Sequence, residues 1–196
     1  MCNHFRNLPE ALATVESWRE YVSHFRYDDP PEEVYPKRQA VVVRATDEGN
    51  VAETMHWGFP WVTKGKRPGT TKKMNTTNVR NLKSPLFRGI INSPENRCLV
   101  PFTEFAEPKP KAGREEVWFT VTEAEISAFA GIWRPDKVVG NVFAFLTCEP
   151  NPLVKPIHPK AMPVVLEPDD YDRWLSGEDA ASFQQPFPSQ LMAIVD

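Results

Sequence analysis

Apolar residues near the start of the chain recur at three- and four-residue spacing. The stripe consists of Leu8, Leu12, Val15, Trp18, Val22 and Phe25. This period predicts an amphipathic helix with one buried face. Asn7 and Glu10 resemble a capping pair at its first turn, where Pro9 is tolerated. The polar run at residues 28–33 marks its end.

Most of the remaining pattern is typical of short strands. Residues 39–45 and 51–57 are apolar runs separated by the turn sequence of residues 47–50, which predicts a hairpin. Further strands are predicted at residues 97–101, 116–122, 127–133, 142–148, 162–166 and 191–195. Short helices are predicted at residues 84–91 and 169–176, each with the flanking residues that favour a helix end.

Strands therefore outnumber helices, without the strand–helix alternation of a parallel sheet and without internal repeats. We expect one α+β domain over residues 1–196, built on a curved, mainly antiparallel sheet that forms a partly closed barrel, with a few peripheral helices. A chain of 196 residues that is 41% hydrophobic is long enough for a substantial core.

The sequence indicates a reducing compartment. No stretch approaches the roughly 20 apolar residues of a membrane span, and the N-terminus lacks the apolar core of a signal peptide. Cys2, Cys98 and Cys148 lie too far apart to predict a disulfide framework, and with His4 they lack the paired spacing of a zinc site. We expect a cytoplasmic protein that needs no metal or cofactor, and nothing requires more than a monomer.

Charge is unevenly distributed. Residues 63–97 hold nine of the 23 Lys and Arg residues but only one of the 26 Asp and Glu residues. A basic segment in an otherwise acidic chain favours a surface that binds a polyanion. The alternative is a solvated loop, and residues 64–73 have the composition of one.

Two tryptophans, Trp57 and Trp61, lie on a Gly- and Pro-containing turn directly before the basic segment. Aromatic rings beside basic side chains are typical of surfaces on which nucleic-acid bases stack. Core packing is the commoner use of tryptophan, so this alternative stays open.

Cys2 offers chemistry that other residues at this position do not. If Met1 is removed, Cys2 carries a thiol and an α-amine on neighbouring carbons. Both groups keep a nucleophilic fraction near neutral pH, because their ordinary pKa values are about 8.5 and about 7.7–8.0. The amine can form an imine with an aldehyde, and the thiol can then close a thiazolidine ring on the same carbon. The alternative is a Cys2 without a function.

This chemistry needs groups that position the aldehyde and move protons. Asn75 follows the basic loop, Glu104 and Glu107 follow the predicted strand at 97–101, and His158 precedes the strand at 162–166. Each also has a structural interpretation. Asn75 is a possible turn cap, Glu107 a possible solvated side chain, and His158 a possible neutral packed imidazole.

The order of short motifs resembles one known family. The motifs are Cys2, Trp57-Gly-Phe-Pro, Asn75 followed by Pro85-Leu-Phe-Arg88, Arg97-Cys-Leu-Val-Pro101, Phe105-Ala-Glu107, Ala130-Gly-Ile-Trp133, Leu146-Thr-Cys-Glu-Pro-Asn151 and Ile157-His158 with Met162-Pro-Val-Val-Leu166. Together they resemble the SRAP (SOS-response-associated peptidase) family, whose members shield abasic sites in single-stranded DNA. The resemblance covers nearly the whole chain.

The resemblance implies specific roles. Met1 would be removed by the protein itself, and Cys2 would link to the aldehyde of the abasic deoxyribose. Asn75 would orient the DNA and the linkage, Glu107 would transfer protons and assist Met1 removal, and His158 would promote sugar-ring opening, imine formation and slow reversal. Thr147, Asn151 and Lys160 would line the site or meet phosphate.

The chain departs from the family pattern at several positions. His4 replaces an arginine that follows the cysteine in the family, and Lys160 stands at another arginine position. Lysine keeps the charge but loses bidentate phosphate geometry. In the family's Asn-Ala-Arg-x-Glu motif, Asn75 is followed by Thr77 in place of arginine, with Arg80 as a possible substitute. These differences indicate a divergent branch.

The sequence thus predicts an abasic-site sensor of single-stranded DNA that is nucleoid-associated when bound to damaged DNA, with autopeptidase and lyase-like activity. The expected catalytic residues are Cys2, Asn75, Glu107 and His158. The expected DNA-binding residues are His4, Trp57, Trp61, Lys72, Lys73, Arg80, Arg88, Thr147 and Lys160. The alternatives are an N-terminal-nucleophile amidohydrolase that uses Cys2, and a non-catalytic single-stranded-DNA-binding module.

Overall fold

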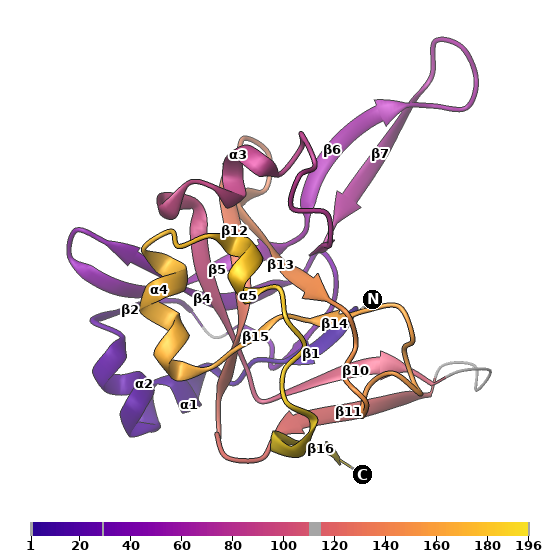
Figure 1. Ribbon diagram of the computed structural model, residues 1–196. Coiled ribbons are helices and arrows are strands. Elements are labelled where there is room, and N and C mark those ends of the chain that lie inside the picture. The colour runs from indigo at the N-terminus through magenta and orange to yellow at the C-terminus, as the bar shows by residue number, and fades with distance from the viewer. Residues whose placement is uncertain (1, 29, 110–114, 196) are drawn as a thin grey trace.

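The computed structural model describes residues 2–28, 30–109 and 115–195. Strands form the body of the molecule, and short helices lie at its periphery (Figure 1). This architecture confirms the α+β class with a mainly antiparallel, barrel-forming sheet and few helices.

Five strands form a closed barrel. They are β4 (Gln39–Thr46), β5 (Gly49–Trp57), β9 (Arg97–Phe102), β12 (Ser127–Asp136) and β13 (Gly140–Cys148). Antiparallel pairing runs from β5 through β4, β9 and β12 to β13, and a parallel β13–β5 pair completes the ring. Closure removes the free edges that an open sheet would expose.

Short strands extend the barrel. They are β2 (His24–Arg26) beside β5, β8 (Asn78–Val79) and β14 (Met162–Pro163) beside β13, and β15 (Val165–Leu166) beside β12. The single strand predicted at 162–166 is wrong, because Val164 separates two short strands. The Val164 N–H donates to Leu146 on β13 at 2.9 Å, and its carbonyl accepts from Ala130 on β12 at 3.0 Å.

A second sheet holds the N-terminal strand. Its order is β16 (Met192–Val195), β11 (Glu116–Val121), β10 (Glu104–Pro108), β1 (His4–Arg6) and β3 (Glu33–Val34). In the β1–β10 pair, His4 lies opposite Ala106 and Phe5 opposite Phe105. This register brings the first residues of the chain beside the carboxylate-bearing end of β10.

Aromatic packing fixes β1 against the barrel. Phe5 is fully buried and its ring meets Trp57 edge-on at 5.0 Å and Phe129 at 5.9 Å. Phe129 stacks on Phe102 at 3.9 Å. Burial of a phenylalanine stabilises the fold by about 1.5–3 kcal/mol. Phe5 therefore anchors the backbone that carries Cys2.

The basic segment forms a hairpin that projects from the body. β6 (Phe59–Lys64) pairs antiparallel with β7 (Thr71–Thr76), and the pair extends well beyond the barrel (Figure 1). The sequence predicted a loop at residues 64–73, so only the tip of that segment agrees with the prediction. The strand-forming pairs along it include Val62 with Lys73 and Thr63 with Lys72.

The helices are short. They are α1 (Pro9–Thr14), α2 (Glu16–Tyr21), α3 (Arg88–Ile91), α4 (Tyr171–Leu175) and α5 (Ala180–Phe183), with 3₁₀ turns η1 (Pro94–Asn96), η2 (Pro168–Asp170) and η3 (Ser189–Leu191). The long helix predicted from Leu8 to Phe25 is wrong, because Val15 is extended with ψ 119° and divides α1 from α2.

The predicted cap is also wrong. Asn7 is buried, donates to the carbonyls of Val41 and Pro101, and accepts from the Val41 N–H. Its amide therefore joins the start of the chain to the barrel instead of capping α1. No helix in the described ranges is both long enough and apolar enough to cross a membrane.

Candidate active site

Cys2 lies at the base of β1 and is fully buried. Its thiol donates a hydrogen bond to the His4 carbonyl, with 3.4 Å between Sγ and O. Burial raises the pKa of the Cys2 thiol well above its ordinary value, and the nearby negative charge of Glu107 raises it further. The thiol is thus protonated at neutral pH and needs a proton acceptor before it can act as a nucleophile.

Glu107 is the carboxylic acid whose charge affects the pKa of Cys2 most. It is fully buried on β10, opposite Val117 of β11. Burial raises the pKa of Glu107 to about 7, and the charge of Glu116 acts in the same direction. A carboxyl group that titrates near pH 7 can both donate and accept protons at physiological pH. The structure therefore brings together Cys2 and Glu107, two of the four residues predicted as catalytic.

The amide that contacts Cys2 belongs to Asn78. Its Nδ2 donates to the Cys2 carbonyl at 2.9 Å and to Thr77 Oγ1 at 2.8 Å. Asn78 is buried on β8, where it pairs with Phe145 of β13. Its Oδ1 is also buried and has no hydrogen-bond partner within the described residues. A buried acceptor left open on a residue that contacts Cys2 is available to a donor on a bound ligand.

Sequence reasoning missed Asn78 and selected Asn75 instead. A signal for Asn78 was present, because Asn78-Val-Arg80 reproduces the spacing of asparagine and arginine in the Asn-Ala-Arg motif. The structure places Asn75 on β7, with its amide against the backbone of Gly58. The part that Asn75 takes in the linkage to DNA stays a prediction.

His158 lies on the turn between β13 and β14. Its Nδ1 lies 2.7 Å from the Ala161 carbonyl oxygen and 3.2 Å from the Ala161 nitrogen, so the Ala161 backbone holds the ring in place. Partial burial lowers the pKa of His158, so the ring is neutral at pH 7. A neutral imidazole is suited to accept a proton. Its action on Cys2 chemistry stays a prediction.

Three of the predicted DNA contacts, Trp57, His4 and Thr147, are buried. Trp57 is fully buried, its indole N–H donates to Thr77 at 3.1 Å, and its ring packs against Phe145. The faces of its ring pack against core residues, so the prediction that bases stack on Trp57 does not fit the structure. The structure fits the alternative, in which Trp57 packs in the core.

His4 is also enclosed. Only 3% of it is exposed, its ring stacks on Tyr35 at 4.0 Å, and Nδ1 lies 2.7 Å from Glu116 Oε2. Glu33 approaches Nε2 at 3.7 Å. A ring held between two carboxylates is not presented to phosphate, so His4 does not replace the DNA-contacting arginine in this structure.

The remaining candidates differ in exposure. Lys72, Lys73, Arg80, Arg88 and Lys160 are exposed, and Trp61 is half-buried with its N–H on Thr76 Oγ1 at 2.9 Å. Arg80 forms an ion pair with Glu149. Thr147 is buried, and so is Asn151, whose amide binds the Phe187 carbonyl and caps the following turn. These last two residues are structural in the geometry observed.

The basic segment also contains a residue that does not face solvent. Arg97 is 2% exposed and lies 4.2 Å from the centre of the Trp174 ring. It donates to the carbonyls of Ile91, Trp174 and Glu178. Arg97 therefore belongs to the core, and the polyanion-binding surface predicted from residues 63–97 is smaller by one charge.

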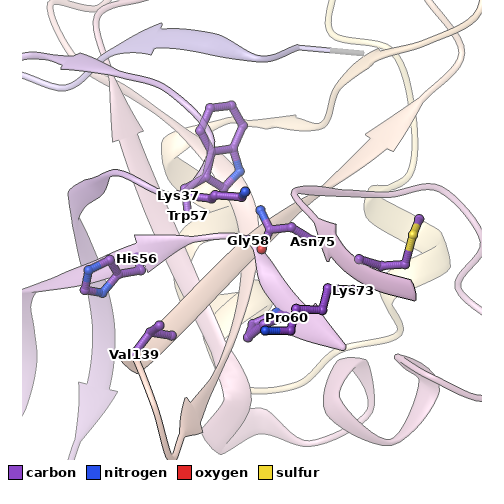
Figure 2. A pocket seen from close by; sticks show the side chains of 9 residues that line it. Lys37, His56, Trp57, Gly58, Pro60, Lys73, Asn75 and Val139 are labelled. Carbon is purple, nitrogen blue, oxygen red and sulfur yellow. The ribbon is translucent and has the colours of Figure 1, made fainter. Parts of the chain in front are cut away.

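A pocket of about 310 Å³ lies at the junction of β5, β6 and β7. Its lining residues are Lys37, His56, Trp57, Gly58, Pro60, Lys73, Met74, Asn75 and Val139 (Figure 2).

Within residues 2–28, 30–109 and 115–195, no group of three or more His, Cys, Asp or Glu side chains is arranged to hold a metal ion.

Three solved structures share the fold. A protein from Bordetella bronchiseptica is 24% identical with a TM-score of 0.77, over 100% of both chains. A protein from Bacteroides thetaiotaomicron is 21% identical with a TM-score of 0.74, over 100% of this chain and 92% of the other. A phage-related protein from B. bronchiseptica is 14% identical with a TM-score of 0.67, over 99% and 93%. At these identities the similarity concerns the fold alone.

A comparison with curated proteins gave no match. Residues 1–195 match the family described as SOS response associated peptidase (SRAP).

Proposed function

We propose a function from the premise that this chain belongs to the SOS response associated peptidase (SRAP) family: it captures abasic sites in single-stranded DNA through a covalent bond to Cys2. Family membership connects the chain with the SOS response to DNA damage. The observation that carries the finer proposal is the buried cluster of Cys2, Glu107 and Asn78, in which a titrating carboxyl group and an amide flank the thiol-bearing residue.

The proposed reaction has two bond-forming steps. The ring-opened deoxyribose presents an aldehyde, and the Cys2 α-amine adds to its carbon and forms an imine with loss of one water. The thiol sulfur then adds to the imine carbon while the thiol proton is transferred to nitrogen. The product is a five-membered thiazolidine, and the sum of the steps is aldehyde plus aminothiol giving thiazolidine plus water.

Glu107 is suited to the proton transfers in both steps. Its pKa of about 7 means that protonated and ionised forms coexist at neutral pH. The ionised form would accept the proton of the Cys2 thiol, whose own pKa is raised by burial. The protonated form would donate to the hydroxyl group that leaves as water.

Asn78 is suited to positioning. Its donor holds the Cys2 carbonyl, and its buried acceptor remains open for a hydroxyl group of the sugar. His158 would assist ring opening, as the family resemblance implies. Exposed basic residues on the β6–β7 hairpin and near α3 would bind the phosphates that flank the lesion.

The α-amine must be free before this chemistry can begin. We therefore include removal of Met1 in the proposal, by hydrolysis of the Met1–Cys2 peptide bond with Glu107 as the base that activates water. Met1 itself lies outside the described residues. Cys2 is fully buried, so entry of the sugar also requires movement of the residues around the thiol.

A cross-linking experiment tests the function. Purified protein, with removal of Met1 verified by mass spectrometry, is incubated with an oligonucleotide that contains one abasic site and is then run on a denaturing gel. We expect a heat-stable adduct with the wild type and none with Cys2→Ala. Cys98→Ala removes a buried cysteine of β9 and serves as the matched control that keeps the adduct.

The outcomes separate the competing functions. Absence of an adduct with Met1-free wild-type protein would rule out covalent capture. Salt-sensitive binding without an adduct would then favour a non-catalytic single-stranded-DNA-binding module. Hydrolysis of glutamine or a related amide that depends on Cys2 would favour the amidohydrolase alternative.

A further inference from the structure

The pocket at the junction of β5, β6 and β7 has the charge of an anion site. Lys37, Lys73 and His56 are among its lining residues, and no Asp or Glu of the described chain is. Pro60 and Val139 add apolar surface beside these groups, while the fully buried Trp57 forms the floor. A phosphate that is attached to a flat, partly apolar ring system matches this combination of charges and surfaces.

Two unusual backbone conformations build the pocket wall. Lys37 has φ 71°, a left-handed conformation that is disfavoured for residues with a side chain, and its N–H donates to the Trp57 carbonyl at 2.8 Å. Gly58 has φ 119°, and a Cβ on it would lie 2.1 Å from the Asn75 amide nitrogen. Strain of this kind persists where the surrounding structure fixes it, often at binding sites.

These conformations set the positions of two polar side chains. Figure 2 shows Lys37 and Asn75 directed toward the same part of the pocket, above the backbone of Trp57 and Gly58. Only glycine at position 58 lets the Asn75 amide approach so closely. An amide supplies both a donor and an acceptor, which is the pattern that the edge of a nucleobase requires.

The pocket lies next to the Cys2 site. Trp57 lines the pocket, and its indole N–H binds the carbonyl of Thr77, the neighbour of Asn78. The backbone from Asn75 to Asn78 runs from β7 into β8. Three residues of extended chain span at most about 10 Å, so Asn75 and Asn78 lie close enough to contact neighbouring nucleotides of one strand.

We propose that this pocket binds the nucleotide next to the abasic residue, with Lys73 on its phosphate and with Lys37 and the Asn75 amide on its base. The proposal rests on the proposed function, since it assigns a subsite to the same DNA strand. It gives Asn75 a role in recognising the neighbouring base, separate from the amide contact that Asn78 makes with Cys2.

Binding to a tetrahydrofuran analogue of the abasic site tests the pocket without the aldehyde chemistry. Fluorescence anisotropy compares oligonucleotides of equal length that carry the analogue in the centre, at the 5′ end or at the 3′ end. For the wild type, we expect loss of the neighbour on one side to weaken binding roughly tenfold. Asn75→Ala and Lys37→Gly should bind the central analogue more weakly and lose this dependence on the neighbour.

The variants are chosen so that misfolding does not imitate the result. Glycine at position 37 relieves the positive φ, so Lys37→Gly should unfold at the same temperature as the wild type or higher. Arg19→Gln removes an exposed charge on α2 and should behave as the wild type. Variants that keep the wild-type dependence on the neighbour would overturn the proposal, as would a wild type equally tight on all three oligonucleotides.

Failure of the pocket and failure of the proposed function remain distinct. The analogue cannot react with Cys2, so the dependence of its binding on the neighbouring nucleotide reports on the subsite without the covalent chemistry. An oligonucleotide with a true abasic site reports on the adduct. A missing adduct together with neighbour-dependent binding would reject covalent capture and retain the pocket, and the reverse result would reject the pocket alone.

Discussion

At the scale of single residues, burial sets the pKa values of Cys2 and of Glu107, which lies near it in the fold. The same desolvation that keeps the Cys2 thiol protonated also raises the pKa of Glu107 into the neutral range. The two shifts belong together, because the ionised form of Glu107 disfavours the thiolate and is also the group placed to accept its proton. Cys2 and Glu107 lie 105 positions apart in the sequence, but the fold couples the titration of the thiol to the charge of the carboxyl group.

Glu107 makes folding stability depend on pH. Its folded pKa of about 7 lies above the unfolded value of 4.5, so the native state holds the proton more tightly. Stability contributed by the protonated form is present below pH 4.5 and is lost as pH rises to about 7, a change on the order of 3 kcal/mol. We expect Glu107→Gln to lack this loss in urea unfolding measured from pH 4.5 to 8.

The matched control is Glu123→Gln, because Glu123 is exposed in the turn between β11 and β12. It should follow the wild-type pH dependence. Parallel curves for wild type and Glu107→Gln would show that Glu107 is not the source.

The two candidate asparagines make opposite predictions. Asn78→Ala removes the hydrogen bond to the Cys2 carbonyl and should slow adduct formation at saturating DNA by roughly tenfold to a hundredfold. Asn75→Ala should leave that rate within about twofold and weaken binding. Single-turnover gel assays give both quantities. A larger rate loss in Asn75→Ala would restore the motif position chosen from the sequence and make Asn78 structural.

At the scale of secondary structure, prediction succeeded where the apolar pattern was long. The strands of the barrel were found because β4, β5, β9, β12 and β13 each bury several apolar residues. Strands of two to five residues, such as β1, β3 and β8, are too short to show a period and form only because a partner strand is present. This limit affects prediction of the candidate site most, because β1 directly follows Cys2 and β8 carries Asn78, which contacts it.

The contrast between Arg97 and Arg88 tests how elements are joined. Arg97 links β9 to carbonyls at the end of α3, in α4 and just after α4, so Arg97→Met leaves buried acceptors without donors. We expect a loss of about 3 kcal/mol in urea unfolding and unchanged DNA affinity of the folded fraction. Arg88→Met, at an exposed position of α3, should show the reverse. Equal stability losses would contradict the assignment of Arg97 to the core.

At the scale of the whole molecule, charge is concentrated on a projecting element. The β6–β7 hairpin extends away from the barrel (Figure 1) and carries Lys64, Lys66, Arg67, Lys72 and Lys73 on or near its strands. The sequence indicated this charge correctly but did not predict the hairpin that carries it, because the Lys-, Gly- and Pro-containing run at residues 64–73 has the composition of a loop. An arm of this kind can reach along a strand of DNA that the barrel alone would not cover.

Salt dependence measures the contribution of the hairpin. Replacing Lys64, Lys66, Lys72 and Lys73 by glutamine should reduce the slope of log affinity against log salt by about 0.7 for each lost phosphate contact. Binding to an undamaged single-stranded oligonucleotide, measured from low to high salt, gives the slope. Arg19→Gln on α2 is the control, and an unchanged slope in the lysine variant would show that the hairpin stays clear of the DNA.

The pairing of β1 with β10 also has a consequence for timing. Cys2 leaves the ribosome 105 residues ahead of Glu107, and its fold partners on β10 do not exist until that stretch has been made. At synthesis rates of roughly 5–20 residues per second, this interval lasts about 5–20 seconds. The thiol that is shielded in the finished protein therefore begins as an open one on the nascent chain, and any chemistry at the N-terminus that needs access has its first opportunity before the barrel is complete.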